Sequence, residues 1–278
     1  MRRAMIRGMR AIVLLSALVL SGCTQMIFQP IKAHLVEPKD FGVTYQDYYF
    51  TSYDGLTLHG WYLPAKREKL GTVLFFHGNA QNISTHVGSV YWLPNHGYDV
   101  YIVDYRGYGK SDGVVTLPGA IADIQKSIDD VLAKMPATEK LIVMGQSLGA
   151  SMSAYAVAYS RQRDRIKTLM LVSAFSDYQS IARELLNNHW LTWALQWPLS
   201  LTINNDYRPL DAVGLISPIP LLIMHGEKDE LISYKHAKLL FSQAKAPKQL
   251  INLDGTHNNW SQFAVNQKKL INYLAEIK

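Results

Sequence analysis

The chain has 278 residues, 48% of them hydrophobic and 18% charged, a balance that is typical of a globular protein and excludes a disordered one. Lysine and arginine total 28 against 22 acidic residues, but four of the arginines lie within the first ten residues, so the remainder carries a formal charge of only +2. Such a small excess predicts no basic patch, and we expect no nucleic-acid partner.

The first 22 residues have the pattern of an export signal. A basic start with four arginines is followed by an apolar run at 11–20 and by the small pair Ser21-Gly22. An apolar run of this length, at about 1.5 Å per residue, spans only about half of a roughly 30 Å hydrocarbon core. We therefore predict a signal peptide over 1–22 rather than a permanent transmembrane helix.

The only cysteine of the chain, Cys23, follows this signal directly. The preceding Leu20-Ser-Gly22 resembles the lipobox of bacterial lipoproteins, in which the cysteine is acylated after cleavage. The alternative is a buried thiol, but the position at the predicted cleavage site favours lipidation. The resemblance implies a lipid membrane as partner and a place in the cell envelope outside the cytoplasm. Because Thr24 is not aspartate, it implies the outer membrane in an organism with two membranes.

Residues 23–45 contain Pro30 and Pro38 without a sustained hydrophobic period, and we interpret them as a lipidated tether and a lead-in segment. Residues 46–278 are predicted to form one domain. The first two of its strand-like runs are joined by Asp54-Gly55, a hairpin signal. Eight such runs are present, at 48–52, 56–63, 72–76, 99–103, 140–144, 168–172, 220–224 and 249–253.

Helical patterns separate most of these strands from residue 85 onward. They fall at 85–95, 117–134, 147–160, 234–244 and 258–277. A hairpin followed by repeated strand and helix units predicts an α/β fold with a mostly parallel eight-stranded sheet and helices on both faces.

One interval, 175–215, interrupts this alternation after the sixth strand with a small helical insertion that contains Trp190, Trp193 and Trp197. An insertion at this point can cover the carboxyl ends of the strands, where ligands bind, and its tryptophans would then line an apolar acyl pocket. The alternative is a helix pair that only shields the sheet.

The segment Gly145-Gln-Ser147-Leu-Gly149 follows an apolar strand and begins a helix. A serine on such a tight turn needs small residues two positions before and after it, and the turn holds its hydroxyl at the sheet edge as a nucleophile. The pattern is common by chance, so it indicates a catalytic serine only if an acid and a histidine follow it in that order along the chain.

A serine nucleophile needs a histidine base, and three histidines lie beyond the insertion: His225, His236 and His257. His225 precedes the candidate acid, and His236 lies in a helical pattern that we expect to place it on the surface. His257 lies in a loop between the last strand and the last helix, where a rigid sheet can aim it at Ser147.

The acid that orients this base is predicted to be Asp229, in the loop after the strand 220–224. Glu227, Glu230 and Asp254 compete with it. Asp254 stands before a glycine only three residues from His257, where an aspartate more often shapes its own turn.

The backbone N–H groups of Leu148 and Asn79 are the expected oxyanion donors. Leu148 follows the serine, and Asn79 belongs to a loop after the third strand, in which Gly78 permits close approach of the backbone. His77 precedes the serine in the chain and is expected to hold this loop.

Taken together, these segments resemble an α/β-hydrolase of the compact esterase and acyl-peptidase-like group. The resemblance implies Ser147 as nucleophile, Asp229 as acid and His257 as base, and a scaffolding role for 104–113. Thr256 departs from the glycine that relatives often have before this histidine. The matching segments are Asp54-Gly55 with Gly60-Trp61, 77–79, 104–113, 145–149, 225–229 and 256–257.

The sequence therefore predicts a serine hydrolase that cleaves carboxylic ester or related acyl bonds of a small-molecule substrate through a covalent acyl-enzyme. No cofactor is expected, and no metal, because no tight His/Asp/Glu cluster with ligand spacing appears along the chain. One alternative is a peptidase or amidase with the same triad; another is a lipid-anchored binding or scaffold protein that keeps the fold without turnover. No pattern predicts an oligomeric state.

Overall fold

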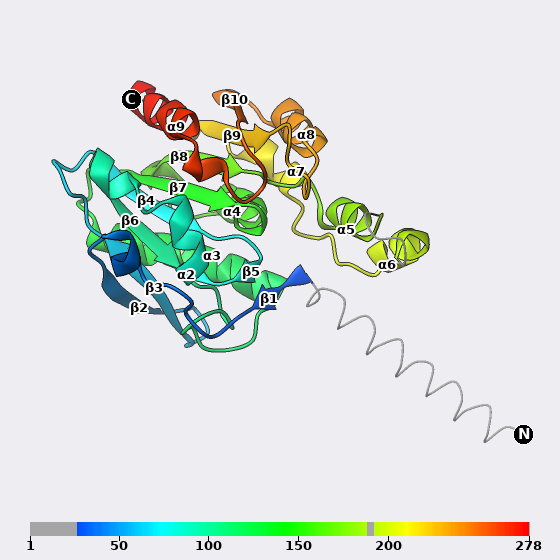
Figure 1. Ribbon diagram of the computed structural model, residues 1–278, viewed down its shortest axis with the longest axis horizontal. Coiled ribbons are helices and arrows are strands. Elements are labelled where there is room, and N and C mark those ends of the chain that lie inside the picture. Colours follow the sequence, from blue (N-terminus) through cyan, green and yellow to red (C-terminus); the bar gives the residue numbers. More distant parts are fainter. Residues whose placement is uncertain (1–26, 188–191, 278) are drawn as a thin grey trace, which may run out of the picture.

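A computed structural model of the chain describes residues 27–187 and 192–277. The predicted lipidation site Cys23 and Trp190 lie outside these ranges. The described part is built around an eight-stranded sheet with the strand order β10-β9-β8-β7-β4-β6-β3-β2 (Figure 1). The antiparallel pairs β2·β3 and β3·β6 form one end of the sheet, and all other neighbours are parallel.

All eight predicted strands of this sheet are confirmed, with ends that differ by one or two residues. They are β2 (Gln46–Thr51), β3 (Thr57–Leu63), β4 (Gly71–Phe76), β6 (Tyr98–Val103), β7 (Leu141–Gln146), β8 (Ile166–Val172), β9 (Leu221–Gly226) and β10 (Lys248–Leu253).

Side chains of the central strands alternate between two buried clusters, one on each face of the sheet. In β4, Leu74 and Phe76 belong to the cluster that is covered by α3 (Leu117–Lys134), α4 (Leu148–Ala158) and α8 (Lys235–Gln243). Val73 and Phe75 belong to the opposite cluster, which α9 (Ala264–Glu276) covers. Because side chains alternate along a strand, the sheet has two apolar faces, and helices cover both of them as predicted.

Two of the predicted helices are shorter or broken. The pattern at 85–95 forms α2 (Ile83–His86) and the 3₁₀ turns η3 (Val87–Ser89) and η4 (Leu93–His96), because glycine and proline interrupt it. Residues 258–263 form turns and η8 (Trp260–Gln262) before α9 begins.

The insertion after β8 consists of short helices, as expected. Figure 1 shows two of them, α5 and α6, standing away from the sheet. Its elements are α5 (Tyr178–Asn187), η6 (Trp193–Leu195), α6 (Gln196–Ser200), α7 (Pro209–Ala212) and η7 (Val213–Leu215).

The lead-in segment packs on the domain. Its strand β1 (Gln29–Pro30) pairs in parallel with β5 (Ala80–Gln81), which lies in the loop after β4, and the side chain of Phe28 is buried. Within 27–187 and 192–277, no helix has the length and apolar character needed to cross a membrane.

A buried ion pair ties the loop after β6 to helix α3. The Arg106 side chain donates to both carboxylate oxygens of the fully buried Asp123, at 2.9 Å from Nε and 2.7 Å from Nη2. Arg106 also reaches Asp54 in the β2–β3 turn at 2.7 Å, and Ser52 donates to Asp123 at 2.8 Å. One guanidinium thus fastens the hairpin turn, the loop and the helix to one another.

We expect Arg106→Ala to lower the free energy of unfolding by about 3–5 kcal/mol, because it leaves the buried Asp123 carboxylate without its cation. Urea denaturation followed by circular dichroism measures this loss. Arg208→Ala is the matched control, since Arg208 pairs with the exposed Asp211 on the surface and should cost at most about 1 kcal/mol. Equal losses in the two variants would contradict the structural role of Arg106.

Candidate active site

Ser147 stands on a strained turn between β7 and α4. Its backbone has φ 55° and ψ −118°, a left-handed conformation that is rare for a residue with a side chain. The Ser147 N–H donates to the Val172 carbonyl at 2.8 Å, which anchors the turn to the end of the neighbouring strand β8. The turn therefore fixes the serine at the carboxyl edge of the sheet.

The glycines on either side are required by close packing. A Cβ at Gly145 would lie 2.6 Å from the backbone of Ala150, and a Cβ at Gly149 would lie 2.4 Å from the carbonyl oxygens of Phe76 and His77. No side chain fits at either position without moving a backbone. The Gly-x-Ser-x-Gly spacing is thus a consequence of two close approaches: Gly145 packs against the start of α4, and Gly149 packs against the end of β4.

The structure brings Ser147, His257 and Asp229 together in one hydrogen-bonded line. His257 Nε2 lies 3.1 Å from Ser147 Oγ, and His257 Nδ1 lies 2.8 Å from Asp229 Oδ2. The three residues follow three different strands, β7, β10 and β9, and His257 and Asp229 are buried.

Asp229 is held as a carboxylate. Burial by itself would raise its pKa, but interactions with His225 and His257 and the backbone N–H of Ile232 outweigh it and hold the pKa of Asp229 well below its usual range. Its second oxygen, Oδ1, accepts from the N–H groups of Leu231 and Ile232 at 3.0 and 2.9 Å. A charged Asp229 can only accept, so the shared proton sits on His257 Nδ1 and leaves the lone pair of Nε2 facing the serine.

His225 supports the acid rather than serving as the base. Its Nε2 lies 2.8 Å from the Ile232 carbonyl oxygen and 3.4 Å from Asp229 Oδ2, so it braces the loop that carries Asp229. Its position four residues before Asp229 was the sequence signal for this contact, although our prediction used it only to exclude His225 as base.

The prediction that His236 lies on the surface is wrong. The residue is fully buried, its Nδ1 lies 2.8 Å from Ser176 Oγ, and its Nε2 lies 3.2 Å from Glu184 of α5. Burial lowers the pKa of His236. The helical pattern of α8 is confirmed, but Ser176 and Glu184 of the insertion contact His236. Spacing within the helix does not show that the insertion packs there.

The two predicted oxyanion donors belong to segments that meet beside the serine. Leu148 is the first residue of α4, where a backbone N–H has no carbonyl partner inside the helix. A Cβ added to Gly78 would lie only 3.5 Å from Ser147 Cβ, which places the loop of Asn79 next to the nucleophile. Two backbone N–H groups in this position can stabilise a developing negative charge.

The lead-in segment braces this oxyanion loop with backbone and side-chain hydrogen bonds. The Asn79 side chain accepts from the Gln29 N–H at 3.0 Å. Asn82, which is buried, donates from Nδ2 to the carbonyls of Ile31 and Ala33, each at 2.8 Å. These contacts fix the loop from outside the sheet. The polar character of the loop was the only feature of the sequence that indicated them.

His77 holds the base of the loop, in agreement with the role that we expected for it. The residue is buried, its Nδ1 lies 2.7 Å from the Gly78 carbonyl oxygen, and its backbone carbonyl accepts from the Tyr105 hydroxyl at 2.9 Å. The nearby His86 was not anticipated: burial and the neighbouring His77 lower the pKa of His86 to about 4, so it is neutral at pH 7.

The described tryptophans of the insertion do not form the enclosed apolar pocket that we considered. The side chains of Trp193 and Trp197 are 59% and 61% exposed, and the Arg183 guanidinium lies over the Trp197 ring at 4.7 Å. The insertion is anchored instead through the buried Tyr178 and Ile181 of α5. The number of tryptophans in the sequence could not distinguish an insertion that lines an acyl pocket from one that only shields the sheet.

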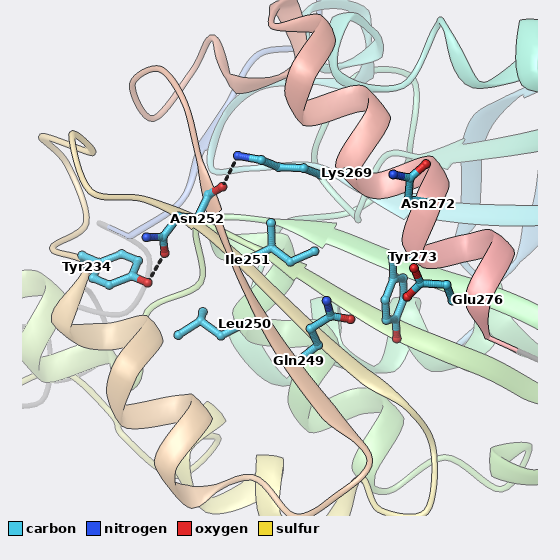
Figure 2. Close-up of a pocket in the computed structure, with 9 residues that line it drawn as sticks. All are labelled: Tyr234, Gln249, Leu250, Ile251, Asn252, Lys269, Asn272, Tyr273 and Glu276. Carbon is cyan, nitrogen blue, oxygen red and sulfur yellow. Dashed lines mark hydrogen bonds between the residues drawn. The ribbon is translucent and has the colours of Figure 1, made fainter.

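A separate pocket of about 600 Å³ lies on the edge strand β10, between α8 and α9 (Figure 2). Lys269 of α9 donates to the Asn252 carbonyl across it at 2.8 Å. Its lining contains none of Ser147, Asp229 and His257, so it is not part of the candidate active site.

Comparisons with known proteins bear on the family and the fold of the chain. A family model described as serine aminopeptidase, S33, matches residues 67–213. The uncharacterized protein YfhR of Escherichia coli O157:H7 is 34% identical over 214 residues, which cover 75% of this chain and 72% of YfhR. The alpha/beta hydrolase domain-containing protein WAV2 of Arabidopsis thaliana is 28% identical, covering 83% of this chain and 78% of WAV2.

Among solved structures, the esterase Pf2001 of Pyrococcus furiosus has a TM-score of 0.72 at 19% identity and covers 90% of this chain and 97% of the esterase. This similarity shows the shared fold. Because the family match spans more than half of the sequence and coincides with the serine turn and the oxyanion loop, the chain is a hydrolase of the α/β-hydrolase superfamily and belongs to the serine aminopeptidase S33 family.

Proposed function

We propose that this protein is a membrane-anchored serine hydrolase that cleaves carboxylic ester or related acyl bonds. The observation that carries the proposal is the 3.1 Å separation of Ser147 Oγ and His257 Nε2, with Asp229 on the other ring nitrogen. The strained backbone of Ser147 supports it, because such strain persists where it positions a reactive group.

The mechanism follows from the proton positions. His257 Nε2 takes the proton of Ser147, and the serine oxygen attacks the carbonyl carbon of the substrate. The negative charge that develops on the carbonyl oxygen is stabilised by the N–H groups of Leu148 and Asn79. His257 then protonates the leaving alcohol, and a water molecule activated by the same imidazole releases the acyl group from Ser147.

A second candidate is a peptidase or amidase that uses the same three residues. The description of the matched family, serine aminopeptidase, favours it. The chemistry at Ser147 would be unchanged, and the difference would lie in protonation of an amine rather than an alcohol as leaving group.

We expect Ser147→Ala to abolish hydrolysis of short-chain nitrophenyl esters, with a fall in kcat of about 10⁴-fold or more, and to abolish labelling by a fluorophosphonate probe. Ser153→Ala is the matched control: it lies on the same helix, and its buried Oγ has no hydrogen-bond partner among the described residues. Activity that is equal in the two variants would refute the proposal.

A panel of nitrophenyl esters, thioesters and aminoacyl amides, assayed with the same purified protein, separates the two candidates. Turnover of amides at a kcat/KM above that of esters would establish the peptidase. Labelling of Ser147 without turnover of any member would instead indicate a site that is formed but has another acyl substrate.

We expect Asp229→Asn to lower kcat by about 10³–10⁴-fold, because an amide in place of the carboxylate no longer holds the proton on His257 Nδ1. Asp254→Asn is the control, since Asp254 is close to His257 in sequence but is exposed and lies 3.5 Å from Lys269 Nζ. Steady-state kinetics on an ester substrate measures both. A greater loss in Asp254→Asn would reassign the acid.

The predicted lipoprotein signal supports a location in the cell envelope, with the acylated Cys23 as anchor. We expect cells that express the full chain to incorporate labelled palmitate into it and to retain it in the membrane fraction, whereas Cys23→Ser should lose the label. Because Cys23 is the only cysteine, no other thiol can take up the label. A Cys23→Ser protein that still carries the lipid would disprove the anchor.

A further inference from the structure

Three residues from distant parts of the sequence meet behind the oxyanion loop. His34 lies on the lead-in segment, His59 on β3, and Asp104 directly after β6. His34 Nε2, His59 Nδ1 and a carboxylate oxygen of Asp104 lie within 4.8 Å of one another. We expected no metal-ligand cluster, because neighbouring ligands of this group lie 25 and 45 positions apart along the chain and form no local pattern.

The separations within this group are too long for hydrogen bonds. Asp104 Oδ2 lies 3.6 Å from His34 Nε2 and 3.9 Å from His59 Nδ1, beyond the 2.7–3.2 Å range of an N–H···O bond. All three atoms are buried, and none has a hydrogen-bond partner within 27–187 and 192–277. Buried polar atoms without partners are costly, so three that face one another call for a shared partner.

His59 and Asp104 are each already oriented by a contact on the other side of the side chain. His59 Nε2 lies 2.6 Å from Asp47 Oδ1, which places the ring proton on Nε2 and leaves a lone pair on Nδ1. Asp104 Oδ1 accepts from the Ile83 N–H at 2.9 Å, which leaves Oδ2 for the group. A histidine that donates to a carboxylate through one nitrogen and presents the other is the arrangement of a metal ligand.

Gly109 lies beside this group without a side chain. A Cβ there would lie 2.0 Å from Asp104 Oδ2 and 3.0 Å from His34 Nε2, so a larger residue would not fit next to the three ligands.

We propose that His34, His59 and Asp104 bind a divalent transition-metal cation of the Zn²⁺ class. Two imidazole nitrogens and one carboxylate oxygen are ligands that Zn²⁺ accepts, and ligands at about 2.0–2.1 Å from a tetrahedral ion lie about 3.3 Å from one another. The two distances to Asp104, 3.6 and 3.9 Å, require a small contraction, and the two imidazole nitrogens, which lie within 4.8 Å of each other, must also close to about this separation.

The role of the cation would be structural. It would fasten the lead-in segment, through His34, to the central sheet at the point where Ile31 and Ala33 accept hydrogen bonds from Asn82 of the oxyanion loop. The site is separate from Ser147 and takes no part in the proposed acyl transfer.

The test uses the full-length chain in detergent, without a histidine tag, after dialysis against a chelator. Titration with Zn²⁺ alone should show one tightly bound equivalent per chain and raise Tm by roughly 5 °C at a hundredfold excess over Kd. Co²⁺ in its place should give the visible absorption bands of a tetrahedral nitrogen and oxygen site.

His34→Ala should abolish this binding and the rise in Tm, and Asp47→Asn should weaken binding by about 10–100-fold while keeping all three ligands. Asp47 is partly exposed, so this variant tests the site even if His34→Ala is unstable. His96→Ala, which removes an exposed histidine, is the matched control and should bind as the wild type does.

Ser147→Ala should also bind Zn²⁺ normally, so failure of the metal site and failure of the hydrolase proposal give different results. Absence of Zn²⁺ binding to the wild type would overturn the proposal. Binding that survives both His34→Ala and Asp47→Asn would overturn it as well, because the ion would then lie elsewhere, for example at His257.

Discussion

The parallel pairing of β4, β7, β8, β9 and β10 is the constraint on which the candidate site depends. Parallel strands end at the same edge of a sheet, so the loops after them meet there whatever their distance in sequence. The oxyanion loop follows β4, Ser147 follows β7, Asp229 follows β9 and His257 follows β10. Since the register of these strands is fixed by two buried clusters, the ends cannot slip relative to one another without exposing apolar side chains. The rigid sheet thereby holds the Ser147 hydroxyl and the His257 imidazole 3.1 Å apart.

A second layer of order comes from the chain that precedes the sheet. The segment from Gln29 to Leu35 makes hydrogen bonds to Asn79, Asn82 and Ser84, and thus surrounds the loop that supplies the second oxyanion donor. A short loop after a strand is free to move unless its polar groups are held, and here the holding groups belong to the segment nearest the predicted lipid anchor. In the proposed function, the segment that leads from the lipid anchor is therefore hydrogen-bonded directly to the oxyanion loop.

Three buried carboxylates of this protein are stabilised in three different ways. Asp123 is paired with a guanidinium and fixes the scaffold. Asp229 is stabilised by backbone N–H groups and two histidines, which leaves it charged and oriented toward His257. Asp104 accepts from the Ile83 N–H through Oδ1, while its Oδ2 faces His34 and His59 at 3.6 and 3.9 Å without a hydrogen bond. A buried charge persists only when the groups around it replace water. The type and distance of these groups distinguish the structural ion pair of Asp123, the oriented acid Asp229 and the candidate metal ligand Asp104.

The sequence alone determined the strands, most of the helices and the identity of the residues that meet at Ser147. These features follow from local rules: side-chain period sets strand faces, and the order serine, acid, histidine follows the order of parallel strands. Only the tertiary structure decided that His236 is buried against Ser176 and Glu184 of the insertion, that Trp193 and Trp197 are exposed, and that His34 reaches His59 and Asp104. Each of these outcomes depends on which distant segment covers a given face, and periodicity within one segment carries no information about what packs against it. The lead-in segment shows this most clearly, because its two prolines and irregular pattern gave no sign that it braces the oxyanion loop.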